Sequence, residues 1–108
     1  MAKQARGRSG LARFGEPGVL ILASLLDGPK HGYAITSDIE ATAGIRLGPG
    51  TLYGALTKLE ERGLIEALAS DDRRRPYAIT SAGRAAVTEQ ITMWDRIVQT
   101  ATRRLSAT

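Results

Sequence analysis

The strongest structural signal in this chain of 108 residues lies in Gly48-Pro49-Gly50-Thr51-Leu52-Tyr53-Gly54-Ala55-Leu56-Thr57-Lys58-Leu59-Glu60-Glu61-Arg62-Gly63. Leu52, Leu56 and Leu59 are spaced i, i+4 and i+7, which places their side chains on one face of an α-helix. Pro49 suits the first turn of such a helix, and Gly63 suits the left-handed position after its end. The sequence therefore predicts a helix with a buried leucine face between these two residues.

The opposite face of this helix offers hydrogen-bonding groups and only one charge. It carries Thr51, Tyr53, Gly54, Thr57 and Lys58. A face rich in donors and poor in carboxylates, near the start of a helix, is typical of insertion against nucleic acid. The alternative is an amphipathic helix whose outer face is only mildly polar.

A β-hairpin is predicted directly after this helix. Residues 66–69 alternate between apolar and polar, residues 70–72 form a turn, and residues 73–79 return as a second strand. A helix followed at once by a hairpin with arginines at its tip is the plan of a winged helix-turn-helix. The arginines at positions 73–75 can lie along a narrow minor groove, although Asp71 and Asp72 offer them partners within the hairpin.

Several segments of the chain resemble the PadR family of transcriptional regulators. They are Leu47–Tyr53, Leu59–Ile65, Tyr77–Gly83 and His31-Gly32-Tyr33, and the resemblance covers about Leu20 to Arg84. The chain departs from the family at Gly54, where many members carry proline. The resemblance implies a homodimeric DNA-binding regulator, in a family whose effectors are often small aromatic or drug-like molecules.

The net charge of +4 is concentrated at the N-terminus. Residues 1–15 contain Lys3, Arg6, Arg8 and Arg13 with no acidic residue, so the rest of the chain sums to zero. We expect residues 1–15 to be a flexible basic arm that either follows DNA phosphates or stays solvated. The predicted organisation continues with a winged helix-turn-helix domain over residues 16–80 and a dimerisation helix over residues 81–108.

Two further helices are predicted before the helix that lies between Pro49 and Gly63. The segment 16–27 is apolar nearly all round, so we expect burial on more than one side and a second subunit near Leu22. The next helix runs from about His31 to Ala43 and ends at Gly44. His31 is expected at the helix start near a phosphate; Tyr33 offers its hydroxyl to a phosphate or packs in the core.

The last helix is predicted from the N-cap Thr80 to about Leu105. Its apolar residues follow a heptad-like spacing that favours a dimer over burial within one chain. The predicted dimer residues are Leu22, Val87, Ile91, Trp94, Val98, Ala101 and Leu105. Around Trp94, with Ile91 and Val98, we expect a slot for a planar aromatic effector, or else plain dimer core. No pocket is expected in the DNA-binding half.

The sequence offers no set of residues for catalysis. It contains no cysteine and one histidine, and no phosphate-binding glycine motif or metal-ligand spacing is present. We therefore expect no enzyme activity, no metal and no cofactor. Without a long apolar run or a signal pattern, no membrane partner is expected, and the expected location is the cytoplasm.

These observations predict a mainly α fold with a small β-hairpin, a winged helix-turn-helix with a long C-terminal dimerisation helix. The predicted function is sequence-specific regulation of transcription, as a repressor released by a small planar aromatic effector. The alternative is a winged-helix module for protein interaction without DNA. The predicted contacts to double-stranded operator DNA come from His31, Tyr33, Gly50, Thr51, Tyr53, Gly54, Thr57, Lys58, Arg73, Arg74 and Arg75.

Overall fold

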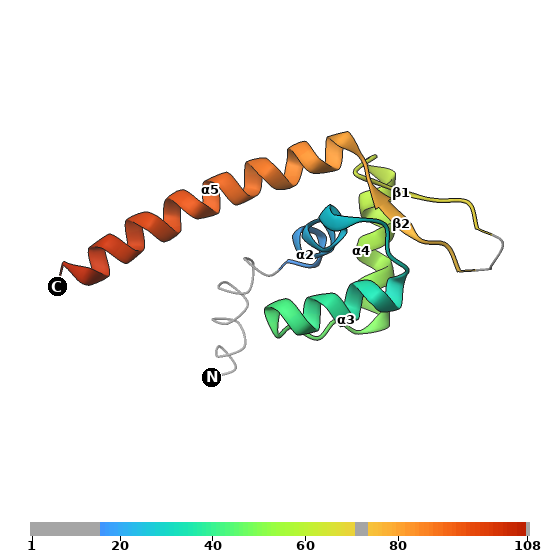
Figure 1. The fold of residues 1–108 in the computed structure, drawn as a ribbon, viewed down its shortest axis with the longest axis horizontal. Coiled ribbons are helices and arrows are strands. Elements are labelled where there is room, and N and C mark those ends of the chain that lie inside the picture. The colour runs from blue at the N-terminus through green and yellow to red at the C-terminus, as the bar shows by residue number, and fades with distance from the viewer. Residues whose placement is uncertain (1–15, 71–73, 108) are drawn as a thin grey trace.

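The computed structural model describes residues 16–70 and 74–107, so predictions for residues 1–15 and for Arg73 lie outside the described part. Within the described residues, four α-helices and one hairpin follow one another (Figure 1). They are α2 (Pro17–Ser24), the 3-10 turn η2 (Leu25–Asp27), α3 (Gly32–Ala43), α4 (Pro49–Glu61), β1 (Ile65–Ala67), β2 (Tyr77–Ile79) and α5 (Ser81–Ser106). The predicted mainly α fold with a small hairpin is confirmed.

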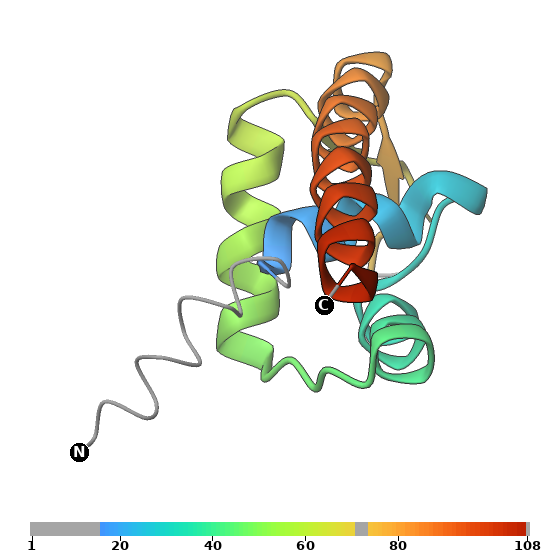
Figure 2. The same ribbon diagram turned by 90° about the vertical axis from the view of Figure 1, so that its left-hand side faces the viewer.

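The hydrophobic core forms around α2, which packs against α3, α4 and α5. Figure 2 shows α2 crossing between α4 and α5. The three leucines of α4 are all buried, which confirms the predicted inner face of that helix. The buried hydrophobic residues are Ile21, Leu22, Leu25, Ile35, Ile39, Leu52, Leu56, Leu59, Ile65 and Val87.

The burial of α2 on several sides is confirmed, but the chain's own helices provide it. Ile21 is fully buried and Leu22 is 4% exposed within the single chain. Val87, on α5, is 1% exposed in the same core. Leu22 and Val87 therefore pack inside the protomer and offer almost no surface to a partner, which corrects their assignment to the predicted dimer surface.

The helix ends lie where glycine permits a left-handed backbone. Gly44 follows α3 with φ 69°, and Gly63 follows the last turn of α4 with φ 74°. Because residues with a Cβ rarely adopt such angles, glycine stops both helices at these positions. Pro49 begins α4 as predicted, and α3 begins at Gly32, one residue after the N-cap His31.

The hairpin strands are shorter than the sequence predicts. Ile65 pairs with Ile79 and Ala67 pairs with Tyr77 in antiparallel register, so Leu68 and Ala69 lie outside β1. Arg74 and Arg75 lie before β2 and not in it, because Pro76 has no N–H to donate to the hydrogen-bond ladder of the hairpin. β2 is also held on its other side, where the Tyr77 N–H donates to the Lys30 carbonyl at 2.9 Å.

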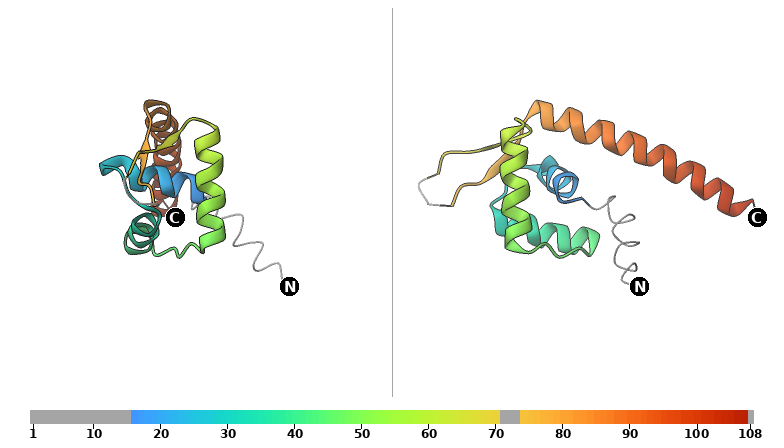
Figure 3. Two further views of the ribbon diagram at one scale, coloured as in Figure 1. Left: turned by 90° about the vertical axis from the view of Figure 1, so that its right-hand side faces the viewer. Right: turned by 180° about the vertical axis from the view of Figure 1, so that it is seen from behind.

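The start of α5 is fixed to the turn between α4 and β1. Thr80 caps the helix by accepting a hydrogen bond from the Gly83 N–H at 3.0 Å, and its hydroxyl donates to the Gly63 carbonyl at 2.7 Å. A Cβ on Gly83 would lie 2.1 Å from the Leu64 carbonyl oxygen, so only glycine fits here. Beyond Val87 most of α5 is exposed, and the helix extends away from the core (Figures 1 and 3).

Candidate nucleic-acid interface

The outer face of α4 is built from a central row and two flanks. At about 100° per residue, Gly50, Gly54 and Thr57 form the central row opposite the leucines. Tyr53 lies on the flank toward the hairpin and is 52% exposed. Thr51 and Lys58 lie on the other flank, and both are exposed. All six residues predicted to contact DNA from this helix therefore share one accessible surface.

The central row of α4 has almost no side-chain bulk in its first turns. Nothing lies within 4 Å of a Cβ built on Gly50 or on Gly54. A helix without side chains along this row can bring its backbone close to a neighbouring surface. The carboxylates of α4, Glu60 and Glu61, lie in its last turn, away from the N-terminal end that is expected to enter a groove.

A hollow of about 320 Å³ lies on the hairpin flank of α4, and we call it the wing-side hollow. It is lined by His31, Gly32, Tyr33, Tyr53, Arg74, Arg75 and Tyr77. Its floor is a close contact between two helices: a Cβ on Gly32 would lie 2.7 Å from the Tyr53 hydroxyl oxygen. Glycine at position 32 therefore allows the first turn of α3 to sit directly beneath the phenol of α4.

Aromatic rings and cations are interleaved in the wing-side hollow. The rings of His31 and Tyr33 stack with centroids 6.2 Å apart, and Arg74 Cζ lies 5.9 Å from the Tyr33 ring centroid. Tyr33 is 60% exposed, so the alternative that it packs in the core is wrong. His31 Nδ1 is buried without a hydrogen-bond partner among the described residues.

The hollow also contains Tyr77, whose hydroxyl is held in its protonated form. Burial raises the pKa of Tyr77 above its ordinary value of 10.0, and the nearby Glu60 carboxylate raises it further. At neutral pH this phenol is therefore a hydrogen-bond donor. Tyr77 was predicted only as part of the second hairpin strand and was not among the predicted site residues.

A hollow of about 450 Å³ lies on the opposite flank of α4, and we call it the α2-side hollow. It is lined by Glu16, Pro17, Gly18, Gly50, Thr51, Gly54, Ala55, Lys58, Leu59 and Arg62. The expectation that the DNA-binding half has no pocket is therefore wrong. The sequence analysis also missed Arg62, although its spacing of i+4 from Lys58 places two cations on one side of the helix.

Polar contacts fix α3 against α2 and so set the angle between these two helices. The Ser24 hydroxyl donates to the Asp38 carboxylate at 2.6 Å, and Lys30 Nζ donates to the Ser24 carbonyl. Lys30 also pairs with Asp27, and this hydrogen bond lowers the pKa of the Asp27 carboxyl below its ordinary value of 3.8. These contacts hold α3 and the segment before it against α2 and η2.

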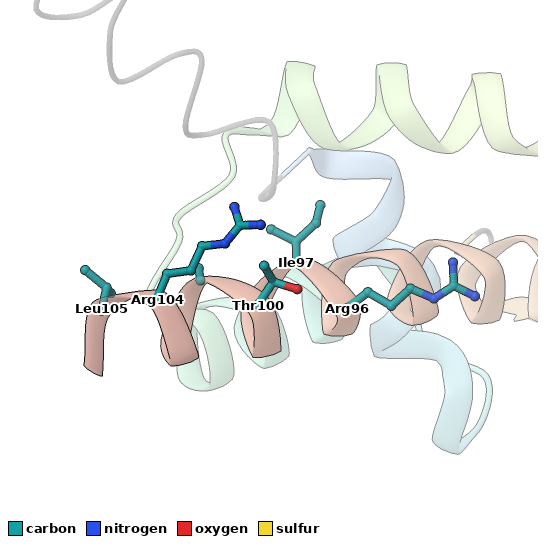
Figure 4. Close-up of a pocket in the computed structure, with 6 residues that line it drawn as sticks. Arg96, Ile97, Thr100, Arg104 and Leu105 are labelled. Atoms are coloured by element: carbon teal, nitrogen blue, oxygen red, sulfur yellow. The ribbon is translucent and has the colours of Figure 1, made fainter. Parts of the chain in front are cut away.

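The exposed part of α5 carries an apolar stripe with arginines beside it. A hollow of about 600 Å³ lies along this helix and is lined by Arg96, Ile97, Thr100, Ala101, Arg104 and Leu105 (Figure 4). All of its walls come from α5, so a second surface is needed to close it. Of the residues predicted to bind an effector, Ile91, Trp94 and Val98, none lines this hollow. Trp94 is half-buried, whereas Ile91 and Val98 are 45% and 58% exposed.

No group of three or more His, Cys, Asp or Glu residues within the described part of the chain could hold a metal ion. None of the helices in residues 16–70 and 74–107 is long and apolar enough to cross a membrane.

Comparison with protein families gives a match between residues 21–89 and the model of the transcriptional regulator PadR-like family. The chain is 44% identical over 72 residues to the transcriptional regulator Rv3488 of Mycobacterium tuberculosis, covering 64% of this chain and 66% of that protein. It is 50% identical over 72 residues to an uncharacterized 37.1 kDa protein of a Streptomyces fradiae transposon, covering 67% of this chain but only 21% of the relative. The chain thus spans less than two thirds of the length of both relatives.

Solved structures of transcriptional regulators share the fold. A transcriptional regulator of Clostridium thermocellum is 26% identical, with a TM-score of 0.75 over 88% of this chain and 94% of that one. A regulator of Eggerthella lenta is 25% identical, with a TM-score of 0.74 over 97% of this chain and 96% of that one.

Proposed function

The chain belongs to the transcriptional regulator PadR-like family, and on that premise we propose that it is a sequence-specific DNA-binding regulator. The observation that carries this proposal is the outer face of α4. It combines a bare central row at Gly50 and Gly54 with donors on both flanks, and its carboxylates are confined to the last turn. Such a face suits the floor of a major groove, where an approaching helix needs donors and little bulk.

In this proposal, Thr51, Tyr53, Thr57 and Lys58 meet base edges and phosphates while the hairpin reaches the adjacent backbone or minor groove. Arg74 and Arg75 are exposed directly beside the wing-side hollow, on the same side as Tyr53. Arg73 and the basic arm lie outside the described residues. In this proposal Arg73 joins the DNA contacts, and the arm either follows phosphates or stays solvated. A regulator of this kind works where the chromosome is, in the bacterial case the cytoplasm.

We also propose that two copies associate through the exposed stripe of α5. Ile91, Val98 and Leu105 are 45%, 58% and 76% exposed, and they share one side of the helix with Trp94 and Ala101. An apolar side of this length is seldom left in water. Two α4 helices in a dimer would face half-sites about 34–36 Å apart.

The regulatory direction that we propose is repression, relieved by a small planar aromatic effector. Support for an effector site is the α5 hollow, which a partner helix would close beside Ile97. The predicted slot at Trp94 lies on the neighbouring row of the same helix. The second candidate function, a protein-interaction module, is favoured by the same apolar stripe, which can dock a partner without any role for α4.

A gel-shift experiment separates these functions. The full chain is titrated against DNA from upstream of its own gene and against a scrambled duplex of equal length and composition. We expect a preference for the upstream DNA, and Thr57→Val should reduce that preference about tenfold, because a good contact to a base contributes about 1–3 kcal/mol of discrimination.

The matched control is Thr92→Val on α5. Both threonine hydroxyls are exposed and donate to the carbonyl four residues earlier, each at 2.9 Å, so both substitutions remove the same local hydrogen bond. Thr92→Val should leave the preference unchanged. Equal binding of both duplexes by the unaltered chain would contradict the proposed function.

A further inference from the structure

The wing-side hollow has the lining of an anion site. Among the described residues, its lining supplies two guanidinium groups, one imidazole and three phenols, and contains no carboxylate. Arg74 and Arg75 are exposed, so a ligand can reach their charges from solvent. A hollow lined by several donors suits a group that only accepts hydrogen bonds, and phosphate is such a group.

The size of the hollow limits what it can hold. At about 320 Å³ it lies at the lower end of the range of about 300–1,000 Å³ that is usual for small-molecule sites. It is also open between α3, α4 and the hairpin, each of which contributes lining residues. A phosphate that is part of a longer molecule fits this shape, because its two ester bonds can leave through the open side.

Three further features direct the hollow toward such a group. His31 Nδ1 is buried and has no hydrogen-bond partner among the described residues. The first turn of α3 contains no acidic residue, so the positive end of its dipole is not neutralised there. Arg74 Cζ lies 5.9 Å from the Tyr33 ring centroid, so its guanidinium already lies beside the hollow.

The wing-side hollow also adjoins the outer face of α4. Tyr53 belongs both to the outer face of α4 and to the lining, and its hydroxyl lies over Gly32 at the start of α3. A ligand in the hollow would therefore touch α3, α4 and the hairpin at once.

We propose that the wing-side hollow seats one phosphate of the DNA backbone, held by Arg74, the Tyr53 hydroxyl and His31. This inference rests on the proposed function and adds a specific contact to it. One seated phosphate on the hairpin flank fixes how far α4 can rotate and slide in its groove. The seat is therefore a positioning contact, which sets the register in which Thr57 meets a base.

The test uses the full chain and the upstream duplex, in which single phosphates are replaced by uncharged methylphosphonates one position at a time. In the unaltered chain, replacing the seated phosphate should weaken binding about tenfold, as expected for a charge-assisted hydrogen bond. In Arg74→Ala, and separately in Tyr53→Phe, the same replacement should weaken binding clearly less than tenfold, because one of the partners of that phosphate is already gone.

Lys58→Ala is the matched control for this experiment. Lys58 lies on the α2-side flank of the same helix, so its loss should weaken binding overall but preserve the tenfold effect at the seated position. If no position has a smaller methylphosphonate effect in both Arg74→Ala and Tyr53→Phe while keeping its full effect in Lys58→Ala, the seat does not exist. That result would leave DNA binding itself intact, whereas failure of the unaltered chain to bind the upstream duplex would overturn both proposals.

A second arm distinguishes a DNA phosphate from a free anion. Inorganic phosphate is added to the complex of DNA and the unaltered chain at constant ionic strength. We expect no release of DNA by low millimolar phosphate. Release from the unaltered chain but not from Arg74→Ala would assign the hollow to a free anion and would overturn the proposed seat.

Discussion

Two glycines, Gly83 and Gly54, show how the same residue serves opposite purposes in this chain. Gly83 is buried where α5 crosses the turn after α4, and its missing Cβ makes room for the Leu64 carbonyl and the Ile79 side chain. Gly54 is exposed in the middle of α4, and no atom lies within 4 Å of its absent Cβ. Gly83 is needed for the close packing of α5 on the turn after α4. Gly54 leaves the outer face of α4 without a side chain at that position.

Replacing each glycine with alanine should therefore shift stability in opposite directions. Gly83→Ala should lower the free energy of unfolding by about 1–3 kcal/mol. The new Cβ would lie 2.1 Å from the Leu64 carbonyl oxygen, so the backbone would have to move. Gly54→Ala should raise it by about 0.5–1 kcal/mol, because alanine favours a helix interior. Urea denaturation of both variants checks this, and a shift in the same direction for both would contradict it.

Asp27 gives a prediction about acid stability. The hydrogen bond from Lys30 lowers the pKa of the folded Asp27 carboxyl below 3.8, so its stabilising contribution is complete above that unfolded value. The contribution is lost as the pH falls through the folded pKa. Unaltered chain should therefore be more stable than Asp27→Asn at neutral pH, and the small difference should close below pH 3.8. Denaturation curves that keep a constant difference across this range would argue against the pair.

At the scale of whole elements, the sequence predicted helices better than the hairpin. The spacing of three leucines determines which face of α4 is buried, and Gly44 and Gly63 mark helix ends by their backbone angles. Strand ends carry no such local marker, because they depend on which N–H groups find partners. The pairing of Tyr77 with Lys30, far away in the sequence, could not be predicted for that reason.

The same limit explains which site residues were missed. The outer face of α4 follows from helical periodicity, so its members were found from the sequence. Most residues of the wing-side hollow were also predicted, but Gly32 and Tyr77 were not. The hollow depends on a contact between Gly32 and Tyr53, which belong to different helices. The assignment of Leu22 and Val87 to a dimer followed apolar spacing alone, which cannot say whether a neighbour in the same chain already covers a residue.

For α5, the two sides of the helix should differ in their effect on association. Ile91 lies on the apolar side and Met93 lies on another side, and both are 45% exposed. Ile91→Ser should weaken the dimer at least about tenfold, because burying such a side chain contributes about 1.5–3 kcal/mol. Met93→Ser should leave the dimer unchanged.

Sedimentation at several concentrations measures both dissociation constants. The substitutions lie beyond Val87, the last buried residue of α5, so neither should unfold the core. Equal weakening by both variants, or a monomeric unaltered chain, would contradict the proposed use of α5.

At the scale of the whole molecule, one core carries three surfaces: the outer face of α4, the hairpin arginines Arg74 and Arg75, and the exposed part of α5. The outer face of α4 and the hairpin arginines lie together at one end, and α5 extends away from them (Figure 1). α2 touches α3, α4 and α5, so it connects the DNA-binding surface to the start of the proposed dimer helix. A change in how two α5 helices pack would be transmitted through α2 to the spacing of two α4 helices, and a ligand can shift that spacing only through its different affinities for the two arrangements.

If this molecule binds DNA mainly through the phosphate backbone, its affinity should depend steeply on salt. That dependence is the most direct test of the proposed function. If a dimer neutralises about six phosphates, the logarithm of the association constant should fall against the logarithm of salt with a slope of about −5. Affinity should then drop about 10³-fold between about 50 and 200 mM salt. The double variant Arg74→Ala, Arg75→Ala should bind more weakly and with a slope shallower by about 2–4. A slope near zero for the unaltered chain, or an unchanged slope in the double variant, would contradict this account.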